Sequence, residues 1–193
     1  MGEIISRRIY DVNGVAAGQT AVVNLPIGLT YHGIDIPYSG VNLAQLTEMR
    51  LLANGDQIQT LRGADVLDVF NKYDGMAAAS GVLPFDFERF GLSTRNAREL
   101  TRIGTNPFPA GSGKGQDPRK ISNLQLEIDI DADAAAPAIP YVIAHQSAPS
   151  ISGTVTRRTR RTYTPGGTGQ FEVSDLVARS GRINRLFIKQ ARS

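Results

Sequence analysis

Residues 108–118, FPAGSGKGQDP, have the glycine content of a loop that binds nucleotide phosphates. A loop of the G-x-x-x-x-G-K-[ST] type needs a glycine at its first position and a hydroxyl side chain after the lysine, where it holds Mg²⁺. Phe108 stands at that first position and Gly115 follows Lys114, so both requirements fail. The glycines therefore indicate a flexible surface loop instead of a nucleotide site.

Three carboxylates alternate in the segment DIDAD, at Asp129, Asp131 and Asp133, which is the spacing that opens an EF-hand calcium loop. That loop also needs a glycine at its sixth position and a glutamate at its twelfth. Ala134 and Pro140 occupy those positions. We expect the three carboxylates to share one solvated face of a strand. Calcium held between two subunits is the open alternative, and no other cofactor is expected.

Catalytic patterns are missing from the sequence. There is no cysteine, which excludes disulfides, thiolate zinc sites and cysteine nucleophiles. His32 and His145 are the two histidines, and neither a G-x-S-x-G nor an H-E-x-x-H segment occurs. A Ser-His-Asp triad could be assembled in space, but no local pattern points to one. We predict a protein that is not an enzyme, with no catalytic residues and no small-molecule substrate.

Basic residues gather in RRTRRTY, which places Arg157, Arg158, Arg160 and Arg161 close to Tyr163. Up to residue 153 the chain has 12 basic and 16 acidic residues, and from residue 154 it has 9 basic and 2 acidic residues. The four arginines are candidates for contact with an anionic surface, either nucleic acid or lipid headgroups. Strand alternation would divide them between two faces. The alternative function is therefore a nucleic-acid or anionic-surface binding module.

The elements that must position these residues are mostly short strands with period-two alternation. The Asn54-Gly55 pair predicts a tight hairpin. One helix is expected within residues 63–75, with Val66, Leu67, Phe70 and Tyr73 on its apolar face and Gly75 at its end. Other predicted strands lie at 18–26, 29–38, 123–131 and 138–146. This pattern predicts an all-β fold, a β-sandwich of the jelly-roll kind.

The predicted domain organisation has a first jelly roll at 1–148, a linker at 149–153 and the opening strands of a second jelly roll at 154–193. Two or three strands cannot close a sandwich by themselves. We expect either a fragment of a longer protein or strands that complete a sheet on a neighbour. The N-terminus has no signal-peptide core, which predicts synthesis in a cytoplasm.

Segments spread over most of the chain resemble one family, the major coat protein of corticovirus-type phages, which are tailless, icosahedral and membrane-containing. The resemblance lies in NLPIGLTYHGI, LAQLTEMRLLANGDQIQ, FNKYDGMAAASGVLPFDFERFG, TRNARELTRIGT, LEIDIDADAAAP, YTPGGTGQFEVSDL and RINRLFIK. It implies a double jelly roll whose homotrimers tile a capsid shell as pseudo-hexagonal capsomers over an internal membrane. It also implies neighbouring capsomers, a vertex (penton) protein and the inner membrane or its proteins as partners. The implied location is the virion.

Overall fold

A computed structural model of the chain describes residues 3–87, 102–105 and 121–150, and in addition Arg158, Thr162, Leu186 and Ile188. The chain divides into two compact units, Met1–Arg160 and Arg161–Ser193, and the fold that follows is that of the first unit. The glycine-rich loop predicted at 108–118 lies outside the described residues. So do the predicted linker, apart from Pro149 and Ser150, and nearly all of the predicted second jelly roll, which stays a prediction.

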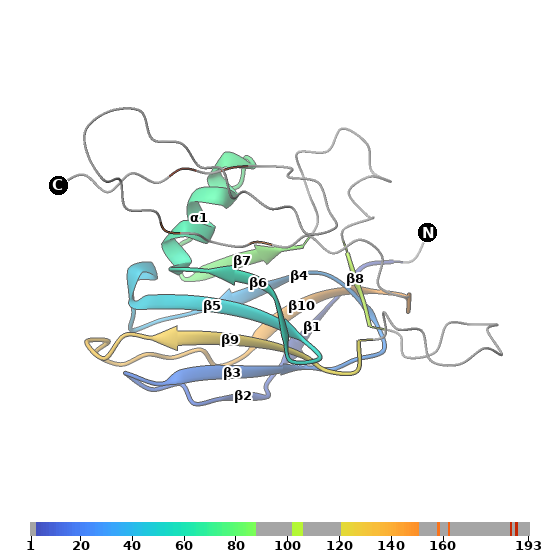
Figure 1. The fold of residues 1–193 in the computed structure, drawn as a ribbon, viewed down its shortest axis with the longest axis horizontal. Coiled ribbons are helices and arrows are strands. Elements are labelled where there is room, and N and C mark those ends of the chain that lie inside the picture. Colours follow the sequence, from blue (N-terminus) through green and yellow to red (C-terminus); the bar gives the residue numbers. More distant parts are fainter. Residues whose placement is uncertain are drawn as a thin grey trace. The chain divides into compact units, whose positions relative to one another are not determined.

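Two antiparallel sheets make up this unit (Figure 1). Sheet A contains β1 (Ile5–Ile9), β10 (Val142–Ser147), β4 (Thr30–Pro37) and β7 (Val82–Asp86) in that spatial order, and β8 (Ile103–Gly104) pairs with the start of β4. Sheet B contains β2 (Val12–Asn13), β3 (Thr20–Leu25), β9 (Leu124–Ile130), β5 (Leu46–Ala53) and β6 (Asp56–Leu61). A 3-10 turn, η1 (Leu43–Gln45), leads into β5.

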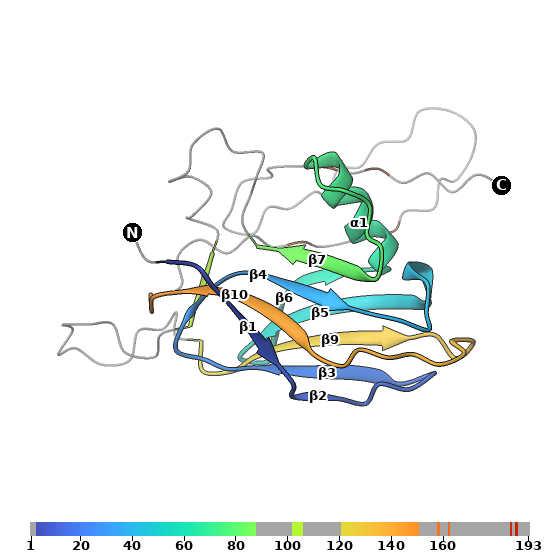
Figure 2. The same ribbon diagram turned by 180° about the vertical axis from the view of Figure 1, so that it is seen from behind.

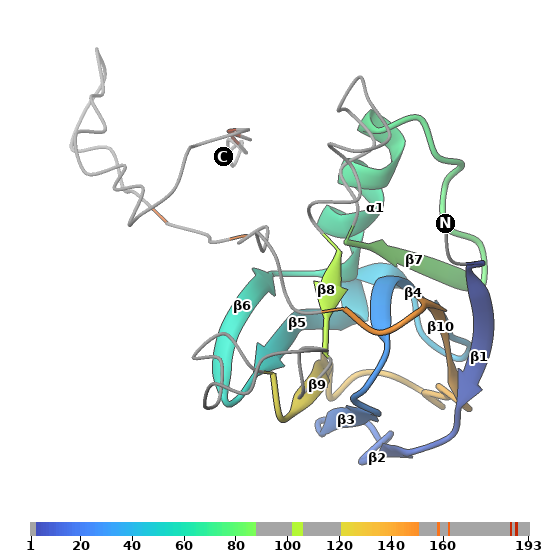
Figure 3. The ribbon, with the colours of Figure 1, turned by 90° about the vertical axis from the view of Figure 1, so that its right-hand side faces the viewer.

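The order of the eight long strands is that of a jelly roll. Numbered along the chain without β2 and β8, these strands follow the order 1-8-3-6 in sheet A and 2-7-4-5 in sheet B. The chain thus crosses repeatedly between the sheets, which face one another as two layers (Figures 2 and 3). This arrangement confirms the predicted jelly-roll sandwich.

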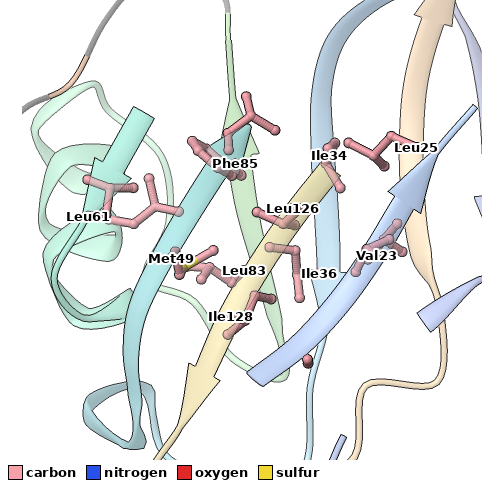
Figure 4. Close-up of a cluster of buried hydrophobic side chains, with 14 of the residues drawn as sticks. Val23, Leu25, Ile34, Ile36, Met49, Leu61, Leu83, Phe85, Leu126 and Ile128 are labelled. Carbon is pink, nitrogen blue, oxygen red and sulfur yellow. The ribbon is translucent and has the colours of Figure 1, made fainter. Parts of the chain in front are cut away.

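Apolar side chains fill the space between the sheets, because apolar and polar residues alternate along the strands. Burial alternates residue by residue along β3 and β9, so that one side of each strand faces the core. Figure 4 shows side chains from both sheets meeting there, among them Ile34 and Phe85 from sheet A and Val23, Met49 and Leu126 from sheet B. Burial of each such side chain contributes about 1.5–3 kcal/mol, which makes this shared core the main source of stability.

The hairpin between β5 and β6 turns at Asn54 and Gly55, as predicted. Their φ angles are 55° and 83°, which are values of the left-handed region. Asparagine and glycine tolerate this region better than other residues do. The side-chain oxygen of Asn54 also accepts the backbone N–H groups of Ser122 and Asn123, at 2.7 and 3.2 Å. The turn is thus tied to the chain segment that enters β9.

The predicted helix is present as α1 (Ala64–Tyr73), but its buried face differs from the predicted one. Leu67 is buried as expected, whereas Tyr73 is 70% exposed. Two polar side chains turn inward in its place. Asn71 Nδ2 donates to the carbonyl of Pro84 at 2.7 Å, and Asp68 Oδ1 accepts the backbone N–H of Ala79 at 2.7 Å. Hydrogen bonds to the backbone of neighbouring segments therefore help to orient this helix, together with its apolar contacts.

Figure 3 shows α1 at the side of the sandwich where β6 and β7 lie, the last strands of sheets B and A. Its contacts are with β5, β6, β7 and η1. Within residues 3–87, 102–105 and 121–150, no helix has the length and apolar character needed to cross a membrane.

Candidate functional site

The outer face of sheet B carries a cluster of charged side chains centred on Arg50 of β5. Arg50 lies opposite Glu127 in the ladder between β5 and β9. Its Nε donates to Glu127 Oε2 at 2.9 Å, and its Nη1 and Nη2 donate to the two carboxylate oxygens of Asp129 at 2.7 and 2.8 Å. Glu48 Oε1 lies 3.4 Å from Nη1. We call Arg50, Glu48, Glu127 and Asp129 the Arg50 cluster.

The Arg50 cluster is half-buried, with the Arg50 side chain 17% exposed. Hydrogen bonding to Asp129 raises the pKa of Arg50, and this effect outweighs the opposing effect of burial. Burial by itself would raise the pKa of Asp129, but hydrogen bonds from Arg50 and Thr20 and the charge of Arg50 lower it on balance. The guanidinium and the Asp129 carboxylate therefore hold each other in the charged state.

The three candidate calcium ligands do not lie on one strand face. Asp129 is on β9 and is bound by Arg50 and by Thr20 Oγ1 at 2.7 Å. The strand ends at Ile130, so the expectation that Asp131 and Asp133 continue its face was wrong. Instead Asp131 Oδ1 accepts the backbone N–H of Asp133 at 2.9 Å in the turn that follows. Among the described residues no group of three or more His, Asp or Glu side chains could hold a metal ion.

The outer face of sheet A carries a line of three side chains across adjacent strands. Ser6 of β1 and His145 of β10 are register partners, and β4 supplies Asp35 from the next strand. Ser6 Oγ lies 3.0 Å from His145 Nδ1, and His145 Nε2 lies 3.0 Å from Asp35 Oδ2. We call these three residues the His145 line. Its members are brought together by strand register, which the sequence alone did not specify.

The His145 line connects three strands of sheet A by hydrogen bonds between their side chains. The hydrogen bond with Asp35, and with it the negative charges of Asp35 and Asp86, raises the pKa of His145 against the opposing effect of burial. In a Ser-His-Asp triad the imidazole takes the proton of the serine through Nε2, while the carboxylate binds Nδ1. In the His145 line the partners are exchanged, with Ser6 at Nδ1 and Asp35 at Nε2. Here the line runs from strand to strand and fastens the edge strand β1 to β10 and β4. We therefore interpret it as a structural feature of sheet A.

His32 lies at an irregularity in sheet A. Tyr31 pairs with Gln146 and Gly33 pairs with His145, so that His32 is the extra residue of a β-bulge. The side chain is buried, and its Nε2 lies 2.8 Å from Ser147 Oγ. Both histidines therefore serve contacts between β4 and β10.

Of the four arginines predicted to meet an anionic surface, Arg158 is described and Arg157, Arg160 and Arg161 lie outside the described residues. The backbone carbonyl of Arg158 accepts the N–H of Thr60 on β6 at 3.0 Å. Its guanidinium carbon lies 5.9 Å from the ring centroid of Phe70 and 5.7 Å from that of Phe85. This arginine therefore contacts rings of the protein itself.

Comparison with known proteins gives a consistent result. The family model of the viral coat protein P2 N-terminal domain matches residues 6–147. The chain is 29% identical over 184 residues to the major capsid protein P2 of Pseudoalteromonas phage PM2, with 95% of this chain and 65% of the relative covered. The crystal structure of the major capsid protein P2 from bacteriophage PM2 matches with a TM-score of 0.63 at 26% identity, over 77% of this chain and 52% of that chain. The chain thus spans less than two thirds of the length of the curated relative that it matches.

Proposed function

Because the chain belongs to the family of the viral coat protein P2 N-terminal domain, we propose that it is a structural subunit of a phage capsid, located in the virion shell. The observation that carries this proposal is the agreement of family and fold over the same residues. The family match covers 6–147, and those residues contain nearly the whole jelly roll, from β1 to β10. A subunit of this kind works by burying surface against other copies and needs no catalytic group.

The finer proposal is that three copies form a trimeric capsomer with a pseudo-hexagonal outline. The support is that the curated relative is longer than this chain, which leaves room for a second jelly roll. Three chains with two jelly rolls each would give the trimer six barrels. Closed symmetry would also cover sheet edges that otherwise invite uncontrolled pairing. Further partners on this proposal are the neighbouring capsomers and a vertex protein.

Light scattering after size exclusion, at low salt and at about 1 M salt, tests the trimer. An obligate shell interface is large and apolar, so we expect a trimer mass at both salt concentrations. A trimer seen at low salt alone would mean that charged contacts hold the subunits. A monomer at both salt concentrations would contradict a trimer formed by this chain.

We also propose that the basic C-terminal part faces the lipid membrane inside the shell. Its support is the charge balance of 9 basic to 2 acidic residues from position 154 onward. The test replaces Arg157, Arg160 and Arg161 together with glutamine and measures flotation with vesicles rich in anionic lipid. We expect flotation to be lost, because each basic residue near an anionic surface contributes about 1 kcal/mol. Unchanged flotation would contradict membrane contact through these arginines.

A further inference from the structure

The side of the sandwich between β6 and β7 presents a strand edge next to aromatic rings. In sheet B, β6 is the last strand, so one side of its backbone is not paired within the sheet. Such an edge offers hydrogen-bonding groups to any extended segment that reaches it. Phe70 of α1 and Phe85 of β7 lie at the same side of the sandwich, since α1 contacts both β6 and β7. We call β6 with these two rings the β6 edge site.

Arg158 meets the β6 edge site with its backbone. It forms an isolated parallel bridge with Gln59, and Thr60 N–H donates to its carbonyl oxygen at 3.0 Å. Gln59 is 2% exposed, so this bridge forms against a buried part of β6. A backbone contact of this kind fixes the register of Arg158 relative to β6.

The side chain of Arg158 meets the same site. Its guanidinium carbon lies within 6 Å of both ring centroids, at 5.9 Å from Phe70 and 5.7 Å from Phe85. That distance is the range in which a cation is attracted to the face of an aromatic ring. Phe85 is 1% exposed and belongs to the core, whereas the Arg158 residue is only partly buried. The guanidinium therefore lies where the core meets the surface, and loses part of its contact with solvent there.

We propose that the β6 edge site is a binding site for an arginine carried on an extended segment, and that its occupant is Arg158 of the same chain. On this proposal Arg158 anchors the segment that leaves the first unit and does not take part in binding anions. This division of the basic segment was not visible in the sequence, where the four arginines look alike. The proposal does not depend on the capsid role.

The occupant is assigned to the same chain because the chain can reach the site. Arg158 is eight positions after Ser150, and a fully extended chain covers at most about 26 Å over that separation. Arg158 also belongs to the compact unit Met1–Arg160 that contains β6. A short connection within one unit makes the contact intramolecular, with a high effective concentration.

The test is hydrogen exchange of the Thr60 amide in the full-length protein, measured by NMR. Replacing Arg158 with methionine keeps a long apolar stem and removes the cation. We expect the Thr60 amide to exchange roughly tenfold faster in R158M, because local opening at the edge becomes easier. The matched control is R157M, which removes an adjacent arginine and should leave Thr60 exchange unchanged. Phe70→Leu removes one ring from the other side of the contact and should accelerate exchange in the same direction.

Three outcomes would overturn the proposal. The first is unchanged Thr60 exchange in both R158M and F70L. The second is equal acceleration in R157M and R158M, which would mean that the loss of any arginine has this effect. The third is Thr60 protection that disappears on dilution, which would assign the site to a second copy of the chain. If R158M does not fold, R158K and F70L keep the proposal testable, since each changes only one partner of the contact.

Discussion

The outer face of sheet B carries a guanidinium held by carboxylates, whereas the outer face of sheet A carries an imidazole held between a carboxylate and a hydroxyl. In the Arg50 cluster, Arg50 donates to Glu127 and Asp129 at distances of 2.7–2.9 Å. In the His145 line, both contacts of the imidazole are 3.0 Å long. The two faces lie on opposite sides of one shared core. They therefore share a scaffold, and the difference between them lies in the side chains that each one carries.

This difference determines how each face responds to pH. Arginine stays charged at any pH that a folded protein meets, so the Arg50 cluster keeps its cation throughout. Histidine changes charge near neutral pH, so the His145 line changes charge within the range in which proteins work. We therefore expect sheet B to respond to acid only through its carboxylates, and sheet A to respond between acid and neutral pH. The predictions that follow test this contrast.

The largest effect is expected when Arg50 is replaced with methionine. The variant leaves Glu48, Glu127 and Asp129 close together without their shared cation. Loss of one partner from a buried ion pair costs about 3–5 kcal/mol, and the partial exposure of this cluster reduces that to about 2–3 kcal/mol. Urea unfolding at neutral pH should show this loss in the free energy of unfolding.

The matched control for Arg50 is R62M. Arg62 is 62% exposed, and its Nε lies 3.5 Å from Glu48 Oε2. An exposed ion pair of this kind contributes less than about 1 kcal/mol. Equal losses in R50M and R62M would show that the Arg50 cluster is no stronger than a surface pair, and the contrast between the two faces would fail.

A smaller effect on the free energy of unfolding is expected when Asp129 is replaced with asparagine, and this effect should depend on pH. The pKa of Asp129 is lowered in the folded protein, so its contribution to stability is present above the unfolded value near 3.8 and is lost as pH falls through the folded value. In D129N this acid-dependent part is missing. The difference in unfolding free energy between wild type and D129N should therefore be about 1–2 kcal/mol at neutral pH and should shrink in acid.

Urea titrations at several pH values between about 7 and 3 would measure this trend. D131N serves as the control, because Asp131 lies in the turn after β9 and accepts the backbone N–H of Asp133. A difference between wild type and D129N that stays constant from neutral pH to acid would contradict the assigned role of the Asp129 carboxylate.

The sequence predicts those features of this molecule that depend on residues close together in the chain, and misses those that depend on residues far apart in it. The jelly-roll class, the turn at Asn54-Gly55 and the alternating strand before Asp131 follow from local patterns, and the structure confirms them. The end of β9 at Ile130 was missed because the alternation of acidic residues continues into a turn. The buried face of α1 was missed because Asn71 and Asp68 turn inward to bond backbone groups of other segments.

Local sequence patterns could not predict which charged side chains meet on the two faces. Arg50 and Asp129 are 79 residues apart in the sequence, and Ser6 and His145 are 139 residues apart. Each pair meets only because one particular register aligns the strands. Strand alternation predicts that such residues point outward, but it does not say which of them lie opposite one another. The contact of Arg158 with Phe70 and Phe85 is of the same kind.

The smallest effect is expected from the His145 line, and it tests the contrast most directly. The pKa of His145 is raised in the folded protein, mainly by its hydrogen bond to Asp35, with Asp86 as a second nearby carboxylate. A raised pKa gives stability that is fully present below the unfolded value of about 6.5 and is lost as pH rises through the folded value. The variant H145Q keeps hydrogen-bonding capacity without titrating there. Wild type should therefore gain up to about 1 kcal/mol over H145Q on going from pH 8 to pH 5.5.

Urea unfolding of the two proteins at both pH values measures this gain, and two further variants locate its source. Asp35→Asn removes the main partner of His145 and should abolish most of the pH-dependent gain. Ser6→Ala removes the hydroxyl at Nδ1 but leaves Asp35 in place, so it should lower stability at both pH values and leave most of the gain. R50M should keep the gain in full, because Arg50 lies on the opposite face. If R50M abolished the gain, the two faces would be coupled through the core, and their different responses to pH could no longer be assigned to the side chains that each face carries.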